Sequence, residues 1–80
     1  MADSTSGKAG GLGAKIKAKR LRSGWTQAEL AARVGVHVET VSRWEREERE
    51  PSIAHAKELA LRLGGSWRSY APAVVRNGQL

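Results

Sequence analysis

The chain of 80 residues contains no cysteine, which excludes disulfides and thiolate metal sites. Neither can therefore support the thin core of so short a domain. No apolar run approaches the roughly 20 residues that a membrane-spanning helix needs. Residues 1–11 also lack the apolar stretch of a signal peptide. These absences favour a single small domain in a reducing, intracellular setting.

Acidic residues are scarce relative to basic ones, with 8 against 14, which gives a net charge of +6. This excess favours a polyanionic partner, with nucleic acid ahead of an anionic membrane. The basic residues crowd the first 22 positions, whereas residues 45–50 read Glu-Arg-Glu-Glu-Arg-Glu. A membrane surface fits poorly, because the basic segment carries few large apolar residues.

Helical periodicity organises the middle of the chain, and no segment shows a clear strand pattern. We expect a disordered basic arm over residues 1–11, a folded domain over 12–71 and a flexible tail over 72–80. The predicted class is all-α. Its five helices are expected at residues 12–23, 27–34, 38–46 and 53–63, with a short one after Ser66 that carries Trp67 and Tyr70.

Local signals mark the ends of these helices. Thr26 and Glu29 have the spacing of a capping box, and Ser52 suits the N-cap of the fourth helix. Gly35 ends the second helix and opens a tight turn. Ala31 is small where the second and third helices must approach closely. Residues 26–45 therefore predict a helix-turn-helix, whose second helix can enter a major groove.

The chain resembles the phage-repressor family of helix-turn-helix regulators, also called Cro-like or XRE. Thr-Gln-x-Glu-Leu-Ala, Val-Gly-Val, Ser-Arg-Trp-Glu, Pro-Ser and Leu-Gly carry the resemblance between Leu12 and Tyr70. It implies a five-helix, lambda-repressor-like domain that binds operator double-stranded DNA, usually as a homodimer and usually as a repressor. The implied location is the cytoplasm, at the nucleoid, of a prokaryote or its phage.

The resemblance also assigns roles to residues. The family position of Gln27 contacts a DNA phosphate at a helix N-terminus. On the outer stripe of 38–46, Arg43 suits guanine, Glu39 suits cytosine N4 and Val38 suits a thymine methyl. The alternative is that this stripe is an ordinary solvated helix face. It is disfavoured because helix 38–46 is the second helix of the helix-turn-helix motif. The full predicted DNA-contact set is Gln27, His37, Val38, Glu39, Thr40, Ser42, Arg43, Arg46, Lys15, Lys17 and Arg49.

Two further features concern structure rather than contact with DNA. Arg20 and Glu45 each lie on an apolar stripe, and the family pattern pairs these positions, so we expect a structural ion pair. The alternative is two unrelated surface charges of little energetic value. Glu47 stands where the family commonly has glycine, which predicts a longer third helix and puts the usual loop contacts with phosphate in doubt. Lysines 15, 17 and 19, with a Lys8 arm, would then supply them.

Other function classes fit less well. The chain has no catalytic triad, phosphate loop or metal-ligand spacing, and His37 and His55 are its only histidines, so we expect no enzyme, metal or cofactor. An antitoxin that binds its own operator and a toxin protein is the main alternative. Its protein-facing surface would be the acidic segment 45–50 and the tail at Val74 and Val75. A protein-interaction module without DNA binding is disfavoured by the basic charge.

Overall fold

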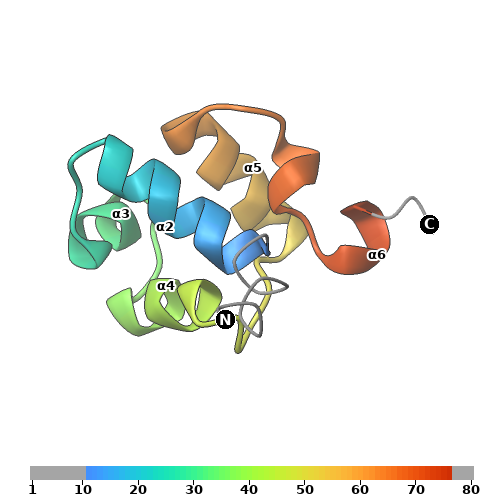
Figure 1. Ribbon diagram of the computed structural model, residues 1–80, viewed down its shortest axis with the longest axis horizontal. Coiled ribbons are helices and arrows are strands. Elements are labelled where there is room, and N and C mark those ends of the chain that lie inside the picture. The colour runs from blue at the N-terminus through green and yellow to red at the C-terminus, as the bar shows by residue number, and fades with distance from the viewer. Residues whose placement is uncertain (1–10, 77–80) are drawn as a thin grey trace, which may run out of the picture.

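The computed structural model describes residues 11–76, which form helices joined by turns and loops, with no strand among them (Figure 1). The predicted all-α class is confirmed, and the five predicted helices are present within one residue of their expected bounds. In chain order, the elements are α2 (Leu12–Arg22), α3 (Gln27–Val34), α4 (Val38–Glu45), α5 (Ile53–Leu63), the 3-10 helix η1 (Trp67–Tyr70) and α6 (Ala73–Arg76).

The expected capping signals set the helix starts. The Thr26 hydroxyl accepts from the Glu29 N–H at 3.0 Å, and the Glu29 carboxylate accepts from the Thr26 N–H at 2.8 Å. Ser52 caps α5 in the same way by accepting from the N–H of His55. These bonds satisfy N–H groups that have no partner inside the helix, so they hold each boundary in place.

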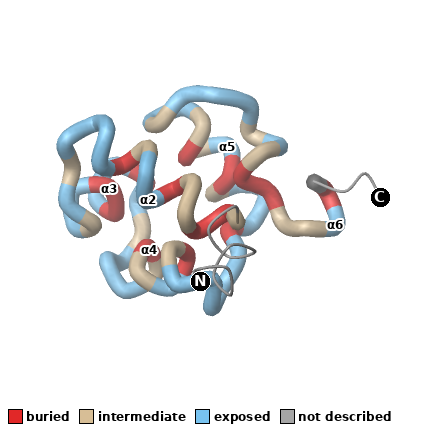
Figure 2. Tube along the Cα trace, viewed as in Figure 1, coloured by how far each residue is buried: buried red, intermediate tan, exposed pale blue. Residues whose placement is uncertain are grey.

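One core lies between α2, α3, α4, α5 and η1, where buried backbone segments meet in the middle of the molecule (Figure 2). The Tyr70 hydroxyl donates to the carbonyl oxygen of Gly64 at 2.7 Å, and burial raises the pKa of Tyr70. The phenol thus closes the loop between α5 and η1 from inside the core. The largest fully buried side chains are Trp44, Tyr70, Ile16, Leu30, Leu59, Val41 and Pro51.

The C-terminal segment differs from the flexible tail expected over residues 72–80. Ala73–Arg76 form α6, and Val75 is buried in the core cluster. The Ala73 N–H donates to the Glu50 carboxylate at 3.0 Å, which supports the first turn of this short helix. The expected arm over residues 1–11 lies outside the described residues except for Gly11, and so do residues 77–80 of the tail.

Candidate nucleic-acid interface

Helices α3 and α4 form a tight corner with α4 at one edge of the molecule (Figure 1). Gly35 makes the turn possible, because its φ of +88° is a conformation that favours glycine. The N–H groups of Gly35 and Val36 both donate to the carbonyl oxygen of Ala31. Val41 and Trp44 anchor α4 in the core, which leaves its opposite side free to meet a partner.

The outer face of α4 brings together most of the predicted base-reading residues. Val38 is 38% exposed, Glu39 and Arg43 are exposed, and Ser42 is half-buried. Arg46 follows directly as the C-cap of the helix. The helix has eight residues, so it is about 12 Å long, which suits one passage across a major groove about 12 Å wide.

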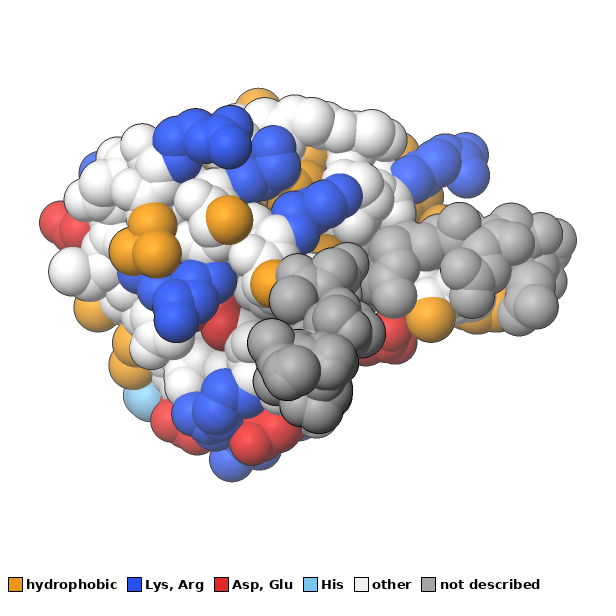
Figure 3. Space-filling model, viewed as in Figure 1, with side chains coloured by type: hydrophobic (Ala, Val, Ile, Leu, Met, Phe, Trp, Pro, Cys, Tyr) orange, Lys and Arg blue, Asp and Glu red, His pale blue; other side chains and the backbone are white. Residues whose placement is uncertain are grey.

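The charged residues of this face are paired with one another. Arg43 Nε lies 3.3 Å from Glu39 Oε2, and Arg46 Nη2 lies 3.5 Å from the same oxygen. Arg46 also donates to both carboxylate oxygens of Glu48, at 3.0 and 3.1 Å, and to the Ser42 hydroxyl. These bonds to Arg46 lower the pKa of Glu48 and raise the pKa of Arg46. Acidic and basic side chains are accordingly interleaved over α4 (Figure 3).

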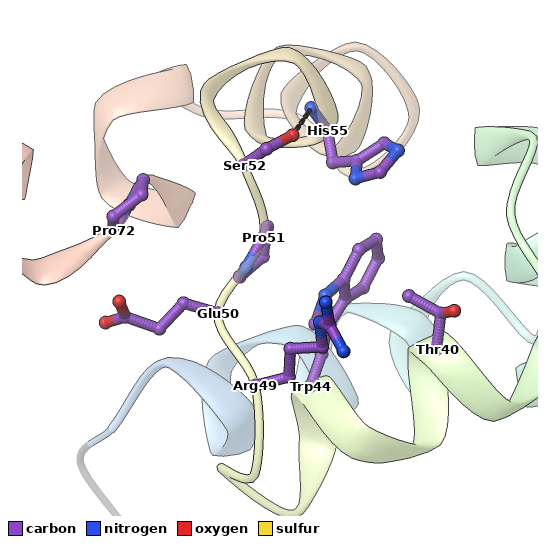
Figure 4. Close-up of a pocket in the computed structure, with 8 residues that line it drawn as sticks. All are labelled: Thr40, Trp44, Arg49, Glu50, Pro51, Ser52, His55 and Pro72. Carbon is purple, nitrogen blue, oxygen red and sulfur yellow. Dashed lines mark hydrogen bonds between the residues drawn. The ribbon is translucent and has the colours of Figure 1, made fainter.

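Three predicted contact residues lie beside the outer face rather than on it. The His37 side chain caps α4, since its Nδ1 accepts from the Glu39 N–H at 3.1 Å. Thr40 and Arg49 line a pocket between α4 and the start of α5, together with Trp44 and His55 (Figure 4). The rings of Trp44 and His55 are 5.6 Å apart across this pocket. A phosphate contact by Thr40 or Arg49 would therefore lie at the edge of the reading surface.

Glu45 joins the first, second and third helices of the domain through one carboxylate. Arg20 Nε and Nη2 donate to it at 2.6 and 3.0 Å, so the predicted ion pair is present. The side chains of Arg20 and Glu45 are only 8% and 4% exposed. The hydrogen bonds to Glu45 raise the pKa of Arg20. Gln27 Nε2 donates to the same carboxylate at 3.0 Å, which fixes the predicted phosphate-contact side chain at the start of α3.

The lysines of α2 are placed differently from the α4 face. Lys15 Nζ lies 5.6 Å from the centre of the Tyr70 ring, which directs it toward η1, and Lys17 is exposed. Lys and Arg side chains follow the upper edge of the molecule in Figure 3 without acidic neighbours. The expected Lys8 contact lies outside the described residues.

The longer third helix predicted from Glu47 is wrong. Helix α4 ends at Glu45, and Glu47 has a φ of +65°, the left-handed conformation that sequence reasoning reserved for glycine. Its carboxylate accepts from the Gly13 N–H at the start of α2. A carboxylate at a helix N-terminus is favourable, and α2 has no side-chain cap of its own. This contact offsets the cost of the backbone conformation.

Gly13 is the residue that sequence reasoning missed. A Cβ at this position would lie 2.5 Å from the carbonyl oxygen of Glu45 and 2.7 Å from that of Trp44. Only glycine lets the first turn of α2 approach the last carbonyls of α4 so closely. The signal in the sequence was a glycine inside a predicted helix, which costs helix stability unless packing requires it.

The glutamates of the acidic segment 45–50 have specific partners within the domain. Glu45 binds Arg20, Glu47 binds the Gly13 N–H, Glu48 binds Arg46 and Glu50 binds the Ala73 N–H. Val75 is buried and only its neighbour Val74 is exposed. Residues 46–50 nevertheless remain exposed, so these contacts hold the segment in place without burying it.

Within residues 11–76, no group of three or more metal-ligating side chains comes together. None of the helices in this part of the chain has the length and hydropathy of a membrane span. The exposed face of α4, with Gln27 beside it, is the candidate site.

A tight helical corner with its second helix free at the surface defines a helix-turn-helix domain. Residues 16–69 match the model of the HTH_3 family, described as Helix-turn-helix. The chain belongs to this family, the Cro/C1-type or XRE group of DNA-binding transcription regulators, which is not known for enzymes. The search of curated proteins and the search of solved structures returned no match.

Proposed function

We propose that the chain represses transcription by binding an operator with the outer face of α4 placed in the major groove. The observation that carries this proposal is the exposure of Val38, Glu39 and Arg43 along one side of a helix whose other side is anchored by Trp44. A rigidly held helix that presents donors and acceptors at its surface is what base-edge recognition requires. Acting on DNA implies that the protein works inside the cell.

Each side chain of this face has a role that fits its chemistry. Arg43 donates bidentately to O6 and N7 of guanine, Glu39 accepts from an exocyclic amino group, and Val38 contacts a thymine methyl. Ser42 is short enough to let the helix approach the bases. Arg46 is held by Glu48 at the end of α4, so it contributes less to base contacts than the other residues of this face.

Gln27 positions the domain on the DNA backbone. An amide nitrogen carries two hydrogens, and one of those on Gln27 Nε2 is donated to Glu45. The second hydrogen and the free N–H groups at the start of α3 are available to a phosphate oxygen. Thr40, Arg49 and the lysines of α2 contact phosphates at the flanks, and His37 borders a phosphate while it caps α4.

One copy of α4 reads too few base pairs to select a site in a genome, so we propose that the chain binds as a homodimer. Two half-sites would then lie about 10 base pairs apart, one turn of the double helix. The occupied operator represses by excluding the transcription machinery.

Selection of bound duplexes from a random DNA pool, followed by sequencing, tests this function. We expect an inverted repeat with a guanine in each half-site. Arg43→Ala should then lose about 1–3 kcal/mol of preference for that guanine. Lys17→Ala, by comparison, should weaken binding to all sequences alike and reduce the salt dependence by about one phosphate contact. Absence of an enriched sequence contradicts operator binding.

A further inference from the structure

The reading face of α4 carries no free positive charge, although the chain as a whole is basic. The Glu39 carboxylate lies within 3.3 Å of Arg43 and 3.5 Å of Arg46, and Glu48 holds Arg46 from the other side. Two arginines thus face two glutamates. Helix α2, by contrast, contains five basic residues and no acidic one, and four of the five lie outside the buried Arg20–Glu45 pair.

This distribution separates affinity for the DNA backbone from recognition of bases. Non-specific binding comes almost wholly from cations that neutralise phosphates. An arginine that is already bound to a carboxylate is less available to a phosphate, because the ion pair must first be broken. The released carboxylate then lies close to the DNA backbone, and its negative charge is repelled by the phosphates. The outer face of α4 therefore adds little attraction to a random sequence.

Docking in the major groove changes the hydrogen-bond partners and the hydration of Glu39 more than those of its neighbours. When Arg43 turns to a guanine, the Glu39 carboxylate loses a donor and loses water at the same time. Of the two arginines beside it, only Arg46 then remains, at 3.5 Å and shared with Glu48, so the desolvated carboxylate is poorly compensated and costly. The amino groups of cytosine and adenine can replace the lost donor, whereas the acceptors of guanine and thymine repel the carboxylate.

From these contacts we propose that Glu39 is a specificity-determining residue, which rejects DNA unless a base amino group lies beside the guanine that Arg43 binds. This inference rests on the proposed function of α4. Residues 39 and 43 are four positions apart, about 6 Å along the helix, so the amino group belongs within two base pairs of the guanine. Discrimination here comes from a penalty against wrong sites, added to the attraction of the right one.

The test compares Glu39→Gln with Glu58→Gln. Glu58 is a matched control, since it forms an i,i+4 pair with Arg62 at 3.5 Å on α5 and both side chains are 43% exposed. Each variant removes one negative charge. Dissociation constants would be measured for the selected operator and for a scrambled duplex, at several salt concentrations, with the wild type alongside.

We expect Glu39→Gln to bind the scrambled duplex about tenfold more tightly, comparable to the effect of one mismatched base pair. Its binding to the operator should change much less, its non-specific salt dependence should steepen, and selection should relax at one position beside the guanine. Glu58→Gln should behave as the wild type.

Equal tightening by both variants would overturn the inference, because net charge alone would then explain it. Weaker binding of Glu39→Gln to both duplexes would also overturn it, since Glu39 would then only orient Arg43. A wild type without any sequence preference would overturn the proposed function itself and this inference with it. A specific wild type with an unchanged Glu39→Gln variant rejects the role of Glu39 alone.

Discussion

Arginine and glutamate pair on both sides of α4, but the inner and outer pairs differ in how much water reaches them. On the inner side, the side chains of Arg20 and Glu45 are 8% and 4% exposed and share two hydrogen bonds. On the outer side, the side chains of Arg43 and Glu39 are 48% and 52% exposed. The two sides have the same chemistry and lie on the same helix.

The difference in burial determines what each side can do. A buried pair is expensive to break, because removing one partner leaves the other charge without water or a counter-ion. An exposed pair contributes little to stability and exchanges readily with other partners. The inner pair therefore fixes the angle of α4, and the outer pairs remain free to exchange for other partners. Four predictions test the contacts on the two sides of α4.

The largest effect is expected for Glu45→Ala. This change leaves Arg20 and the Gln27 amide without their carboxylate, and it should lower the free energy of unfolding by about 3 kcal/mol, as for a broken buried pair. Chemical denaturation would measure it, with Glu58→Ala as the exposed control. A loss below about 1 kcal/mol would place the inner pair in the same class as surface pairs.

Gly13→Ala should come next. In most helices this change stabilises by up to about 1 kcal/mol, but here the new Cβ would meet the carbonyl oxygens of Glu45 and Trp44 at 2.5 and 2.7 Å. Because backbone cannot move aside as a side chain can, we expect a net loss of about 2 kcal/mol from overpacking. Thermal unfolding measures the sign, and a more stable variant would show that α2 does not pack on the end of α4 this closely.

Two substitutions of Glu47 distinguish the cost of its backbone conformation from the stabilisation by its carboxylate. Glu47→Ala removes the carboxylate from the Gly13 N–H and keeps a non-glycine residue at a φ of +65°. Glu47→Gly removes the same carboxylate but relieves the conformation. The glycine variant should therefore be more stable than the alanine variant by about 1 kcal/mol. Equal stabilities in chemical denaturation would argue against a left-handed residue 47.

Much of this architecture could be predicted from local sequence, since the capping box at Thr26, the N-cap at Ser52 and the turn glycine Gly35 all act within a few residues. The inner ion pair needed the family resemblance. Glu47 could not be predicted, because its partner is 34 residues away and is a backbone N–H. Helix α6 was missed for the same reason: burial of Val75 stabilises a segment too short to form a helix alone.

For the candidate site, too, the sequence predicted local spacing but not tertiary contacts. The i,i+4 spacing of Glu39 and Arg43 is visible in the sequence, but the sharing of Glu39 with Arg46 depends on where α4 ends. Thr40 shares the helix with these residues and yet faces the pocket beside α5. A helical stripe therefore predicted which side chains share the exposed face of α4, while tertiary packing decided which of their neighbours lie on it.

The smallest expected effect is the pH dependence of stability that arises from the Arg46–Glu48 pair on the outer side of α4. The hydrogen bonds from Arg46 lower the pKa of Glu48, so its contribution to stability is present above the unfolded-state pKa of glutamate and is lost as the pH falls through the lower folded value. Both side chains are half exposed, so the unfolding free energy should hardly respond. The carboxyl resonance of Glu48, followed by NMR, should nevertheless titrate below the usual range.

Arg46→Ala supplies the contrast for that titration. Without the guanidinium, the pKa of Glu48 should return toward its ordinary value, whereas Arg62→Ala on α5 should leave the titration of Glu48 unchanged. A normal pKa for Glu48 in the wild type would mean that the outer pairs are too short-lived to neutralise Arg46. Arg46 would then be free to bind phosphate on any sequence. The outer face of α4 would in that case contribute to non-specific DNA binding as well as to base recognition.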